Sequence, residues 1–281
     1  MKLLRYGPKG QEKPGLLDGE GKIRSLAGSI ADIDGALLAT GLDALKGLDI
    51  ASLPVVEDGV RIAEPVARVG KFICIGLNYS DHAHEAGMPI PSEPIIFTKA
   101  TSAIIGPNDD VYLPPKSVKS DWEVELGVVI GKEARYVELD NALDHVAGLC
   151  VVNDLSEREY QLERGGQWDK GKGCDTFGPF GPYLVTLDEA GQLDNLGLWL
   201  EVNGKRMQTG NTASLIFDVP YLVHYVSQFM SLQPGDVIST GTPPGVGMGM
   251  KPPVFLNEGD VITLGIDGLG EQRQQVHRTS L

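Results

Sequence analysis

The sequence predicts a β-rich α+β fold. Short apolar or alternating runs, which are typical of strands, outnumber the helical segments, and the helices are not interleaved with the strands as a doubly wound sheet requires. The 36 glycines and 18 prolines are high counts for 281 residues, so many turns are expected. The predicted strands of the main body are 71–77, 94–98, 110–113, 122–130, 147–153, 182–186, 197–203, 236–240 and 261–266, and the predicted helices are 79–87, 155–164 and 213–231.

The N-terminal residues have the pattern of a small unit of their own. Residues 1–7, MKLLRYG, alternate as a first strand, and residues 14–26, PGLLDGEGKIRSL, are typical of a hairpin with its turn at GEG. A short helix is expected within 29–45, and the stretch 51–69, with two prolines, is typical of an extended connector. We therefore predict a small N-terminal α+β domain over 1–69 and a larger domain over 70–281.

The charge balance argues against several classes of partner. With 24 basic and 38 acidic residues, the net charge is 24 − 38 = −14. A surface of this sign binds nucleic acid and anionic membranes poorly, whereas an enzyme for small molecules is consistent with it. A small anionic substrate would then need a local positive site, from a bound cation or from a few lysines and arginines.

Cysteine usage and the start of the chain predict a cytoplasmic location. Cys74, Cys150 and Cys174 occur without a CxxC pair, and two of them lie in apolar runs, so neither a disulfide framework nor a cysteine zinc site is expected. The first residues lack the apolar segment of a signal peptide, and no stretch approaches 18 apolar residues. We therefore expect no membrane partner.

DWEVELGVVIGK, residues 121–132, carries two carboxylates on one face of a predicted strand. Residues two apart in a strand point the same way, so Glu123 and Glu125 lie side by side. Their face continues through glycines and a valine, which are not solvent-facing types. The pair is either a polar outer face or part of a buried site, where a divalent cation would offset the repulsion and desolvation of the two carboxylates. Oxygen ligands favour Mg²⁺, Mn²⁺ or Ca²⁺ over zinc.

AGLCVVNDLSERE, residues 147–159, is an apolar predicted strand that ends abruptly at Asn153 and Asp154. One interpretation is that Asp154 or Ser156 caps the N-terminus of the predicted helix that follows. The other is that Asp154 is a third oxygen ligand at a strand end. Three carboxylates would exceed the charge of a dication, which leaves a role for a nearby lysine and open coordination positions for substrate and water.

GLNYSDHAHE, residues 76–85, begins as a strand and continues as a short polar helix. His82 and Glu85 are three residues apart and are therefore neighbours on one helical face. A carboxylate beside an imidazole orients the ring and raises its basicity, as a general base requires. Ordinary surface pairs share this spacing, and His84 is a competing histidine.

Two glycine-rich segments could supply cations or backbone donors. QWDKGKGCDTF, residues 167–177, contains Lys170 and Lys172 without the GxxxxGK[ST] spacing of a phosphate loop. It is either a surface loop or the source of a lysine for a substrate carboxylate. GDVISTGTPPGVGMG, residues 235–249, is either a tight turn after a strand or an anion pocket of backbone N–H groups, with Thr242 as the first candidate donor.

Seven segments together resemble the fumarylacetoacetate hydrolase family, in its bacterial acylpyruvate hydrolase-like branch. The segments are GLNYSDHAHE, EPIIFTKATSAIIGP, DWEVELGVVIGK, VVNDLSERE, QWDKGKGCDTFGPFGP, EVNGKRMQTGNTASLIF and GDVISTGTPPGVG, and they follow the family order over about residues 70–250. The first 70 residues resemble the small extra domain of many members. The resemblance implies a mixed β-sandwich roll of the family's C-terminal domain type, usually a homodimer, with Mg²⁺ or Mn²⁺ at its centre.

The resemblance also implies roles for individual side chains. The implied metal ligands are Glu123, Glu125 and Asp154. The implied catalytic residues are the water-activating pair His82 and Glu85, and Lys172, which its spacing from Trp168 favours over Lys170. The positions that hold the keto-acid end of the substrate are Arg158, Gln161 and Thr242.

The implied reaction is metal-dependent hydrolysis of the C3–C4 bond of a 2,4-dioxo acid, releasing pyruvate and a carboxylic acid. The substrate would be an acylpyruvate or a 2,4-dioxo-3-deoxy sugar acid. Other chemistries that use the same metal site are oxaloacetate decarboxylation, dienoate isomerisation or hydration, and ureidoglycolate cleavage. A different class of function is a non-catalytic metal-binding scaffold protein.

Overall fold

The computed structural model describes residues 1–85 and 89–280, without the side chains of residues 82–84. The strands are β1 (Lys2–Tyr6), β2 (Lys13–Leu17), β3 (Ile23–Ser25), β4 (Ile62–Ala63), β5 (Phe72–Gly76), β6 (Ile95–Lys99), β7 (Ile104–Ile105), β8 (Val111–Leu113), β9 (Ser120–Asp121), β10 (Val124–Ile130), β11 (Val146–Asn153), β12 (Ser156–Glu157), β13 (Gly178–Val185), β14 (Gly197–Val202), β15 (Lys205–Asn211), β16 (Val237–Ser239), β17 (Val261–Ile266) and β18 (Gly270–Arg278). The α-helices are α1 (Gly35–Leu38), α2 (Asp43–Lys46), α3 (Ser80–Glu85), α4 (Asp169–Lys172) and α5 (Val219–Ser227).

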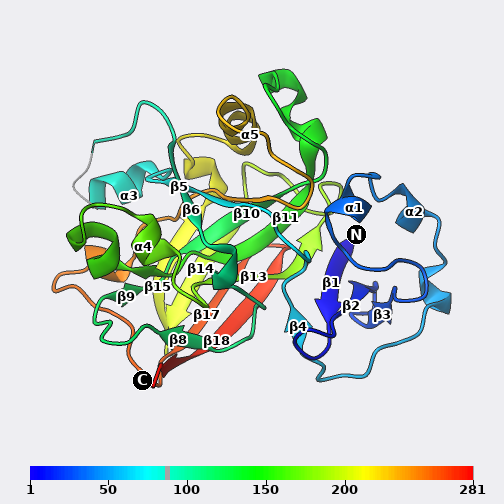
Figure 1. The fold of residues 1–281 in the computed structure, drawn as a ribbon, viewed down its shortest axis with the longest axis horizontal. Coiled ribbons are helices and arrows are strands. Elements are labelled where there is room, and N and C mark those ends of the chain that lie inside the picture. The colour runs from blue at the N-terminus through cyan, green and yellow to red at the C-terminus, as the bar shows by residue number, and fades with distance from the viewer. Residues whose placement is uncertain (86–88, 281) are drawn as a thin grey trace.

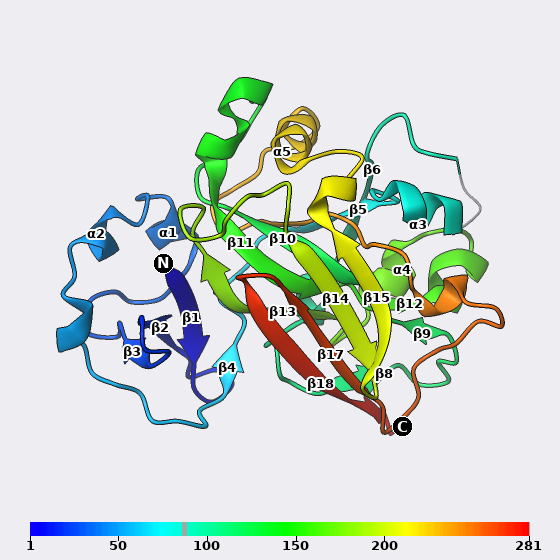
Figure 2. The ribbon, with the colours of Figure 1, turned by 180° about the vertical axis from the view of Figure 1, so that it is seen from behind.

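Two sheets pack face to face, as Figures 1 and 2 show from opposite sides. The larger sheet has the order β3-β2-β1-β13-β11-β10-β16-β5-β6, and the smaller has the order β15-β14-β17-β18-β8. Leu126 and Val128 of β10 share one apolar core with Leu200 and Leu264 of the smaller sheet. Strand pairs of both directions occur, since β16 pairs parallel with β5 and antiparallel with β10. The prediction of a β-rich α+β fold with a mixed sandwich is confirmed.

The antiparallel pair β10–β11 crosses the middle of the larger sheet and is buried on both faces. Along β11, Val151 faces the core between the sheets, whereas Val152 packs on the opposite side in a second core. Burial on both faces explains why these strands appear in the sequence as continuous apolar runs. The register pairs Val124 with Asn153, so the start of β10 lies beside the end of β11. Residues just outside these two strand ends are thereby brought together.

The N-terminal strands extend the larger sheet. β1 pairs with β13, with Leu3 opposite Leu184, and the predicted hairpin is β2–β3. Leu3 and Leu16 belong to the same apolar core as Val152. The division of the chain into domains at residue 69 stays a prediction.

The predicted helix 155–164 is wrong in its first half. Ser156–Glu157 form β12, which pairs with β9, and Glu159–Glu163 form a short π-helix. The cause is the buried carboxylate of Glu157, which accepts hydrogen bonds from the hydroxyls of Ser117 and Ser120. These contacts favour extended pairing over helix continuation at this point.

The predicted helix 213–231 contains the shorter α5, and of the strands longer than two residues, β15 and β18 were not predicted. Asp218 caps α5 by accepting from the N–H of Tyr221 at 2.9 Å, which fixes the later start of the helix. The missed strands, β15 and β18, are rich in polar residues. Their buried glutamines are satisfied by the backbone: the Gln208 Nε2 donates to Pro243 O at 2.7 Å, and Gln272 Nε2 donates to Val151 O at 2.8 Å.

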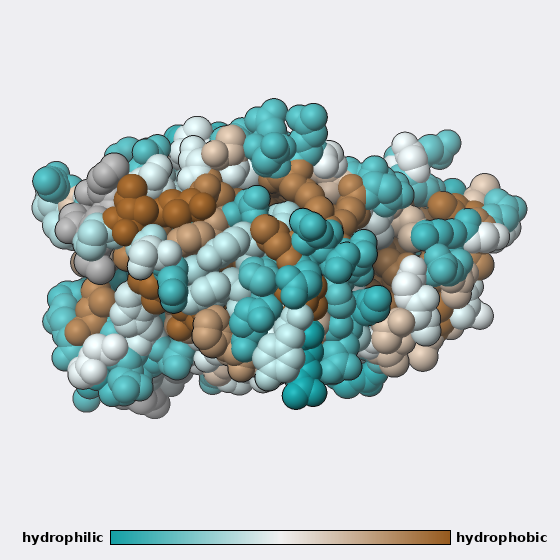
Figure 3. Space-filling view, turned by 90° about the horizontal axis from the view of Figure 1, so that it is seen from above, coloured by the Kyte–Doolittle hydropathy of each residue, from teal (hydrophilic) through white to brown (hydrophobic). Residues whose placement is uncertain are grey.

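One face of the molecule is mostly hydrophilic. Seen from above, hydrophilic groups cover most of this face, with apolar groups in smaller patches between them (Figure 3). Among the residues that the structure describes, no helix is both long and apolar enough to span a membrane.

Candidate active site

Three carboxylates meet where β10 begins and β11 ends. Glu123 precedes β10 by one residue, Glu125 lies within it, and Asp154 follows β11 by one residue. One oxygen from each lies within 4.8 Å of the others, and the residues are 5%, 2% and 0% exposed. The backbone N–H of Asp154 donates to the carbonyl of Glu123 at 2.9 Å, which continues the strand pairing into the site. Because these residues are buried, they do not form a polar outer face of the strand. The carboxylate of Asp154 contacts Lys99 and Lys172, which argues against the interpretation that it caps a helix.

Two buried lysines lie against this carboxylate cluster. The Nζ of Lys172, at the end of α4, is 2.7 Å from both Glu123 Oε2 and Asp154 Oδ2. The Nζ of Lys99, at the end of β6, is 2.5 Å from the other oxygen of Asp154 and 2.9 Å from the carbonyl of Leu155. Burial alone would lower the pKa of Lys172, but the carboxylates of Asp154 and Glu123 outweigh it and raise that pKa. Both lysines therefore offset negative charge in the cluster.

The structure places Lys172, which the resemblance implied, beside the cluster, and it adds Lys99, which the sequence analysis missed. Lys170 instead donates to the carbonyl of Arg164 at the surface, at 2.7 Å. Lys99 ends the run IIFTK, and the other residues of this strand are only partly buried or exposed, so no local pattern marked this lysine.

Arg158 connects the cluster to a fourth buried carboxylate. Its Nη2 lies 2.7 Å from Glu123 Oε1, its Nε lies 2.8 Å from Asp121 Oδ2, and its Nη1 lies 3.0 Å from Gln161 Oε1. Asp121 also accepts from the backbone N–H of Gly247 at 2.7 Å. The structure thus brings Arg158 and Gln161 to the predicted site and adds Asp121, which the sequence argument passed over as the first residue of a strand.

Glu125 is held by donors from the strand and loop after it. The hydroxyl of Ser239 lies 2.5 Å from Glu125 Oε2, and the N–H of Gly241 lies 2.9 Å from the same oxygen. Burial, followed by the nearby carboxylates of Asp154 and Glu123, raises the pKa of Glu125 well above its usual range. A bound cation would remove this electrostatic penalty.

The glycine-rich loop after β16 directs its donors at protein groups. The Gly245 N–H donates to Glu85 Oε1 at 3.0 Å, as the Gly241 N–H does to Glu125. The Thr242 hydroxyl donates to the Val124 carbonyl at 2.9 Å. The N–H groups of this loop therefore bind carboxylates of the protein, and a role of the loop in holding a substrate anion stays a prediction. Thr242 still lines the cavity at the site.

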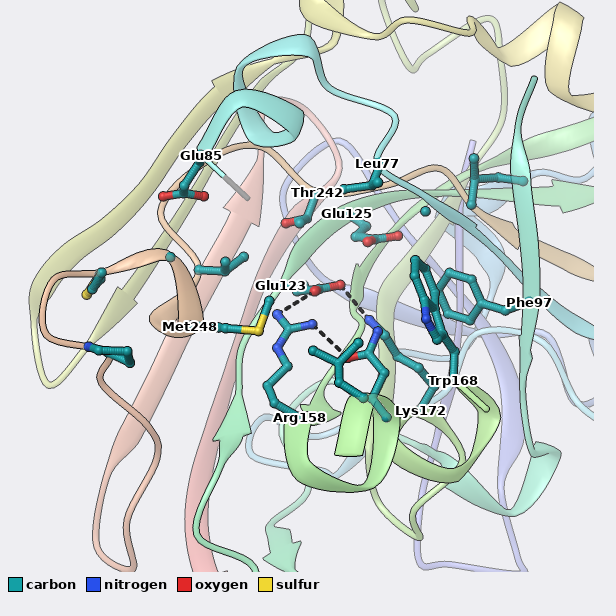
Figure 4. A pocket seen from close by; sticks show the side chains of 18 of the residues that line it. Leu77, Glu85, Phe97, Glu123, Glu125, Arg158, Trp168, Lys172, Thr242 and Met248 are labelled. Atoms are coloured by element: carbon teal, nitrogen blue, oxygen red, sulfur yellow. Dashed lines mark hydrogen bonds and ion pairs between the residues drawn. The ribbon is translucent and has the colours of Figure 1, made fainter. Parts of the chain in front are cut away.

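The structure describes only part of the predicted water-activating pair, His82 and Glu85. His82 lies on α3, but its side chain falls outside the described residues. Glu85, at the end of α3, lines the cavity on the side opposite Trp168 and Phe97, with the carboxylate cluster between them (Figure 4). The pairing of His82 with Glu85 stays a prediction.

The carboxylate cluster borders a cavity of about 550 Å³. Glu123, Glu125, Arg158 and Lys172 line its inner end (Figure 4). Its apolar wall consists of Ile75, Leu77, Phe97, Leu162, Trp168, Val246, Met248, Met250 and Pro253. The rings of Phe97 and Trp168 pack edge to face, with centroids 5.3 Å apart, which gives one side of this wall a defined shape.

The donor set fits a divalent metal ion. Each of Glu123, Glu125 and Asp154 is oriented by hydrogen-bond donors, and when all three are deprotonated as metal ligands they carry three negative charges against the two positive charges of Lys99 and Lys172. Carboxylate oxygens are preferred ligands of Mg²⁺ and Mn²⁺. A dication would bring this group of charges to +1, which suits an anionic ligand.

Comparison with known proteins identifies the family. Residues 71–277 match the model of the fumarylacetoacetate (FAA) hydrolase C-terminal domain. The chain belongs to the fumarylacetoacetate hydrolase family. A relative named "Putative hydrolase", from Burkholderia ambifaria, is 63% identical over 276 residues, which are 98% of each chain. The name of the family and the name of this relative support the conclusion that the chain is a hydrolytic enzyme.

Solved structures of this family share the whole fold. Fumarylacetoacetate hydrolase from Exiguobacterium antarcticum has a TM-score of 0.89 at 35% identity, covering 99% of this chain and 100% of that one. Maleylpyruvate hydrolase from Sphingobium sp. SYK-6, in complex with manganese (II) and pyruvate, has a TM-score of 0.83 at 30% identity, with 100% of both chains covered.

Proposed function

We propose that this protein is a divalent-metal-dependent hydrolase that cleaves the C3–C4 bond of a 2,4-dioxo acid of the acylpyruvate type. The observation that carries the proposal is the meeting of three buried carboxylates, those of Glu123, Glu125 and Asp154, at the inner end of an apolar cavity. A purely structural ion site needs neither open space beside its ligands nor a lysine and an arginine among them. The manganese and pyruvate bound by the Sphingobium enzyme support the same assignment.

The inner end of the cavity would hold the metal and the keto-acid end of the substrate. Glu123, Glu125 and Asp154 would bind Mg²⁺ or Mn²⁺, which as a Lewis acid supplies polarisation of oxygen ligands and stabilisation of negative charge. Lys172 and Arg158 would bind the C1 carboxylate, since both line the cavity and both carry a positive charge. Gln161 and Thr242 line the same end.

His82 is the proposed general base, oriented by Glu85. It takes a proton from water as the water oxygen adds to the C4 carbonyl carbon. The C3–C4 bond then breaks, its electron pair goes to C3, and protonation of C3 gives pyruvate. The acyl group leaves as the carboxylic acid. The hydroxyl group of one water thus ends on the acyl carbon, and its proton ends on C3 of pyruvate. A general base of this kind contributes about 10²–10⁴-fold to the rate.

The wall of the cavity favours an acylpyruvate over a dioxo sugar acid. Beyond the inner end, the lining is dominated by apolar side chains such as Leu77, Trp168 and Met248. Each sugar hydroxyl buried there without a hydrogen-bond partner would cost about 1–3 kcal/mol. An alkyl or alkenyl acyl group gains from the same contacts.

The test is a panel assay with Mg²⁺ and with Mn²⁺. The substrates are an acylpyruvate, a 2,4-dioxo-3-deoxy sugar acid, oxaloacetate, a dienoate and ureidoglycolate. We expect pyruvate release from the acylpyruvate, lost with a chelator and restored by either metal. Turnover of oxaloacetate, the dienoate or ureidoglycolate alone would instead support the decarboxylase, isomerase or hydratase, or lyase chemistry.

Variants separate the roles within the site. Asp154→Ala should lose metal binding and turnover, His82→Ala should keep metal binding and lose hydrolysis, and Glu258→Ala, at an exposed position, is the control. Turnover by Asp154→Ala near the wild-type level would contradict the assignment of Asp154 as a metal ligand.

A scaffold protein with a structural ion is the non-enzymatic alternative. Oxalate, which mimics the enolate of pyruvate, distinguishes the two, because a closed structural site has no position for it. We expect oxalate to bind only when Mg²⁺ is present. The homodimer implied by the family is a separate proposal, which light scattering in solution tests.

A further inference from the structure

The peptide of Val124 lies between two of the three carboxylates of the cluster. Val124 separates Glu123 from Glu125 in the chain, so a shift of its backbone moves both side chains. Its N–H donates to Oε1 of Gln208 at 3.0 Å, and its carbonyl accepts from the hydroxyl of Thr242 at 2.9 Å. Side chains from outside strand β10 therefore bind both backbone polar groups of this residue.

Gln208 and Thr242 also bind each other. Gln208 lies in β15, in the smaller sheet, and its Nε2 donates to Thr242 Oγ1 at 2.8 Å and to the carbonyl of Pro243 at 2.7 Å. The two residues are 0% and 3% exposed. The Val124 peptide, the Gln208 amide and the Thr242 hydroxyl thus form a closed hydrogen-bond ring. Removal of either side chain leaves buried polar groups of the ring unpaired, which is costly.

Chemistry fixes the direction of every hydrogen bond in this ring. The Val124 N–H can only donate, so the oxygen of the Gln208 amide must face it. The amide nitrogen then faces Thr242 Oγ1 and donates to it. A hydroxyl has one proton, and that of Thr242 points at the Val124 carbonyl, which can only accept. Although Thr242 lines the cavity (Figure 4), its hydroxyl therefore has no proton left for a substrate oxygen.

The ring also fixes the loop that holds two carboxylates of the site. In the loop after β16, the N–H of Gly241 binds Glu125 and the N–H of Gly245 binds Glu85, at 2.9 and 3.0 Å. This loop lies directly against β15, because a Cβ on Gly245 would be 2.0 Å from the carbonyl oxygen of Met207. Strand β15 is therefore the common support of the loop and of the start of β10.

We propose that Gln208 and Thr242 are positioning residues of the metal site, which act through the Val124 peptide and without contact with metal or substrate. This inference rests on the proposed metal-dependent function. The like charges of Glu123 and Glu125 favour separation of the two side chains when no ion is bound. By holding the peptide between them, the ring keeps their backbone in the arrangement that the ion requires, which lowers the cost of reorganisation on binding.

Mn²⁺ affinity, measured by titration calorimetry without substrate, tests the inference. Gln208→Met and Thr242→Val are close in size to the wild type and each remove one member of the ring. Each should weaken Mn²⁺ binding about 10–100-fold, as loss of a group that orients metal ligands does. Thr242→Ser retains the hydroxyl and should bind Mn²⁺ within about twofold of the wild type.

Thr212→Val is the matched control for Thr242→Val. Thr212 is also 3% exposed, and its hydroxyl accepts from the N–H of Leu196 at 2.8 Å, but it does not line the cavity. This variant loses a buried hydrogen bond as well, so urea denaturation should show destabilisation while Mn²⁺ affinity stays unchanged. The electron paramagnetic resonance spectrum of bound Mn²⁺, which reports the arrangement of its ligands, should change in Thr242→Val and not in Thr212→Val.

A double variant tests whether the ring acts as a unit. If it does, Gln208→Met combined with Thr242→Val should weaken Mn²⁺ binding by much less than the product of the two single effects. Two fully additive effects would show that the side chains act independently and would overturn the ring as a unit.

The remaining outcomes distinguish this inference from the proposed function. Unchanged Mn²⁺ affinity in either Gln208→Met or Thr242→Val overturns the positioning role. A higher KM of Thr242→Val for an acylpyruvate, at unchanged Mn²⁺ affinity, shows instead that the hydroxyl binds the substrate. If the wild type binds Mn²⁺ but releases no pyruvate from any acylpyruvate, the hydrolase proposal fails, whereas weaker Mn²⁺ binding by the two variants still supports the positioning role.

Discussion

The carboxylate of Asp121 lies directly against the guanidinium of Arg158, with Oδ2 2.8 Å from Nε and the side chains 0% and 5% exposed. Three backbone N–H groups donate to the same carboxylate, those of Trp122, Gly247 and Met248. Asp121 therefore positions both the arginine that binds Glu123 and the loop 247–254, whose residues line part of the cavity.

Replacing Asp121 with asparagine should destabilise the fold. The amide nitrogen of Asp121→Asn would face a donor, and the charge of Arg158 would lose its buried partner. We expect a loss of about 3–5 kcal/mol in the free energy of unfolding, measured by urea denaturation. Asp58→Asn is the control, because Asp58 is exposed and lies 3.5 Å from Lys22, and it should change stability by less than about 0.5 kcal/mol. Equal stability of the two variants would contradict this role of Asp121.

The structure brings together the three carboxylates that the family resemblance implies as metal ligands. A carboxylate next to an apolar strand is a candidate for burial, and a buried carboxylate needs a compensating charge. Glu123 and Glu125 adjoin the apolar run of β10 and Asp154 follows that of β11, but the residues around Asp154 equally fit a helix cap, and only the resemblance decided between the two interpretations. Lys99 and Asp121 are equally buried, but their partners are far along the chain, 55 residues away for Lys99 and 37 for Asp121. Such pairing depends on tertiary structure, so no local pattern predicts it.

Long-range pairing of buried polar groups also explains the errors in the predicted secondary structure. Gln208 and Gln272 are buried in strands that hydrophobic periodicity does not detect, because backbone carbonyls of distant segments satisfy their amides. Glu157 is buried by serines 37 and 40 residues away, and these contacts turn an expected first helical turn into strand β12. Helix and strand boundaries were wrong where buried polar groups form long-range hydrogen bonds.

The two lysines of the site should have separable effects. The Nζ of Lys99 is occupied by Asp154 and the carbonyl of Leu155, and Lys99 is not part of the cavity wall. Lys172 contacts Glu123 and Asp154 and also lines the cavity. Both Lys99→Met and Lys172→Met should alter metal affinity, measured by isothermal titration with Mn²⁺. Only Lys172→Met should raise the KM of an acylpyruvate at saturating metal, by about tenfold or more, because it removes a charge-assisted hydrogen bond.

Both variants need a check of folding by circular dichroism before the kinetics are compared. An equal rise of KM in Lys99→Met would show that the two lysines do not differ in their access to substrate.

Metal binding should release a proton from Glu125. Burial and the neighbouring carboxylates raise the pKa of Glu125 when no cation is present, so the protonated form is favoured, whereas a metal ligand must be deprotonated. Affinity for Mn²⁺ should therefore fall as pH decreases below this raised pKa, by about tenfold per pH unit for one displaced proton. Titration calorimetry at one pH in PIPES and in ACES, which differ in ionisation enthalpy, measures the proton release. Identical heats in the two buffers would show that Glu125 is already ionised before the metal binds.

Gly76 permits Trp168 to form the cavity wall. A Cβ on Gly76 would lie 2.6 Å from Cζ3 and 3.1 Å from Cη2 of Trp168, whose ring packs against Phe97. Gly76→Ala must therefore displace this indole. We expect a shift in tryptophan emission and a rise of about tenfold in the KM of an acylpyruvate, as for an overpacking strain of 1–2 kcal/mol. Gly28→Ala is the matched control, because a Cβ there has no atom within 4 Å. If Gly76→Ala leaves the emission and the KM unchanged, Trp168 does not shape the acyl-binding part of the cavity.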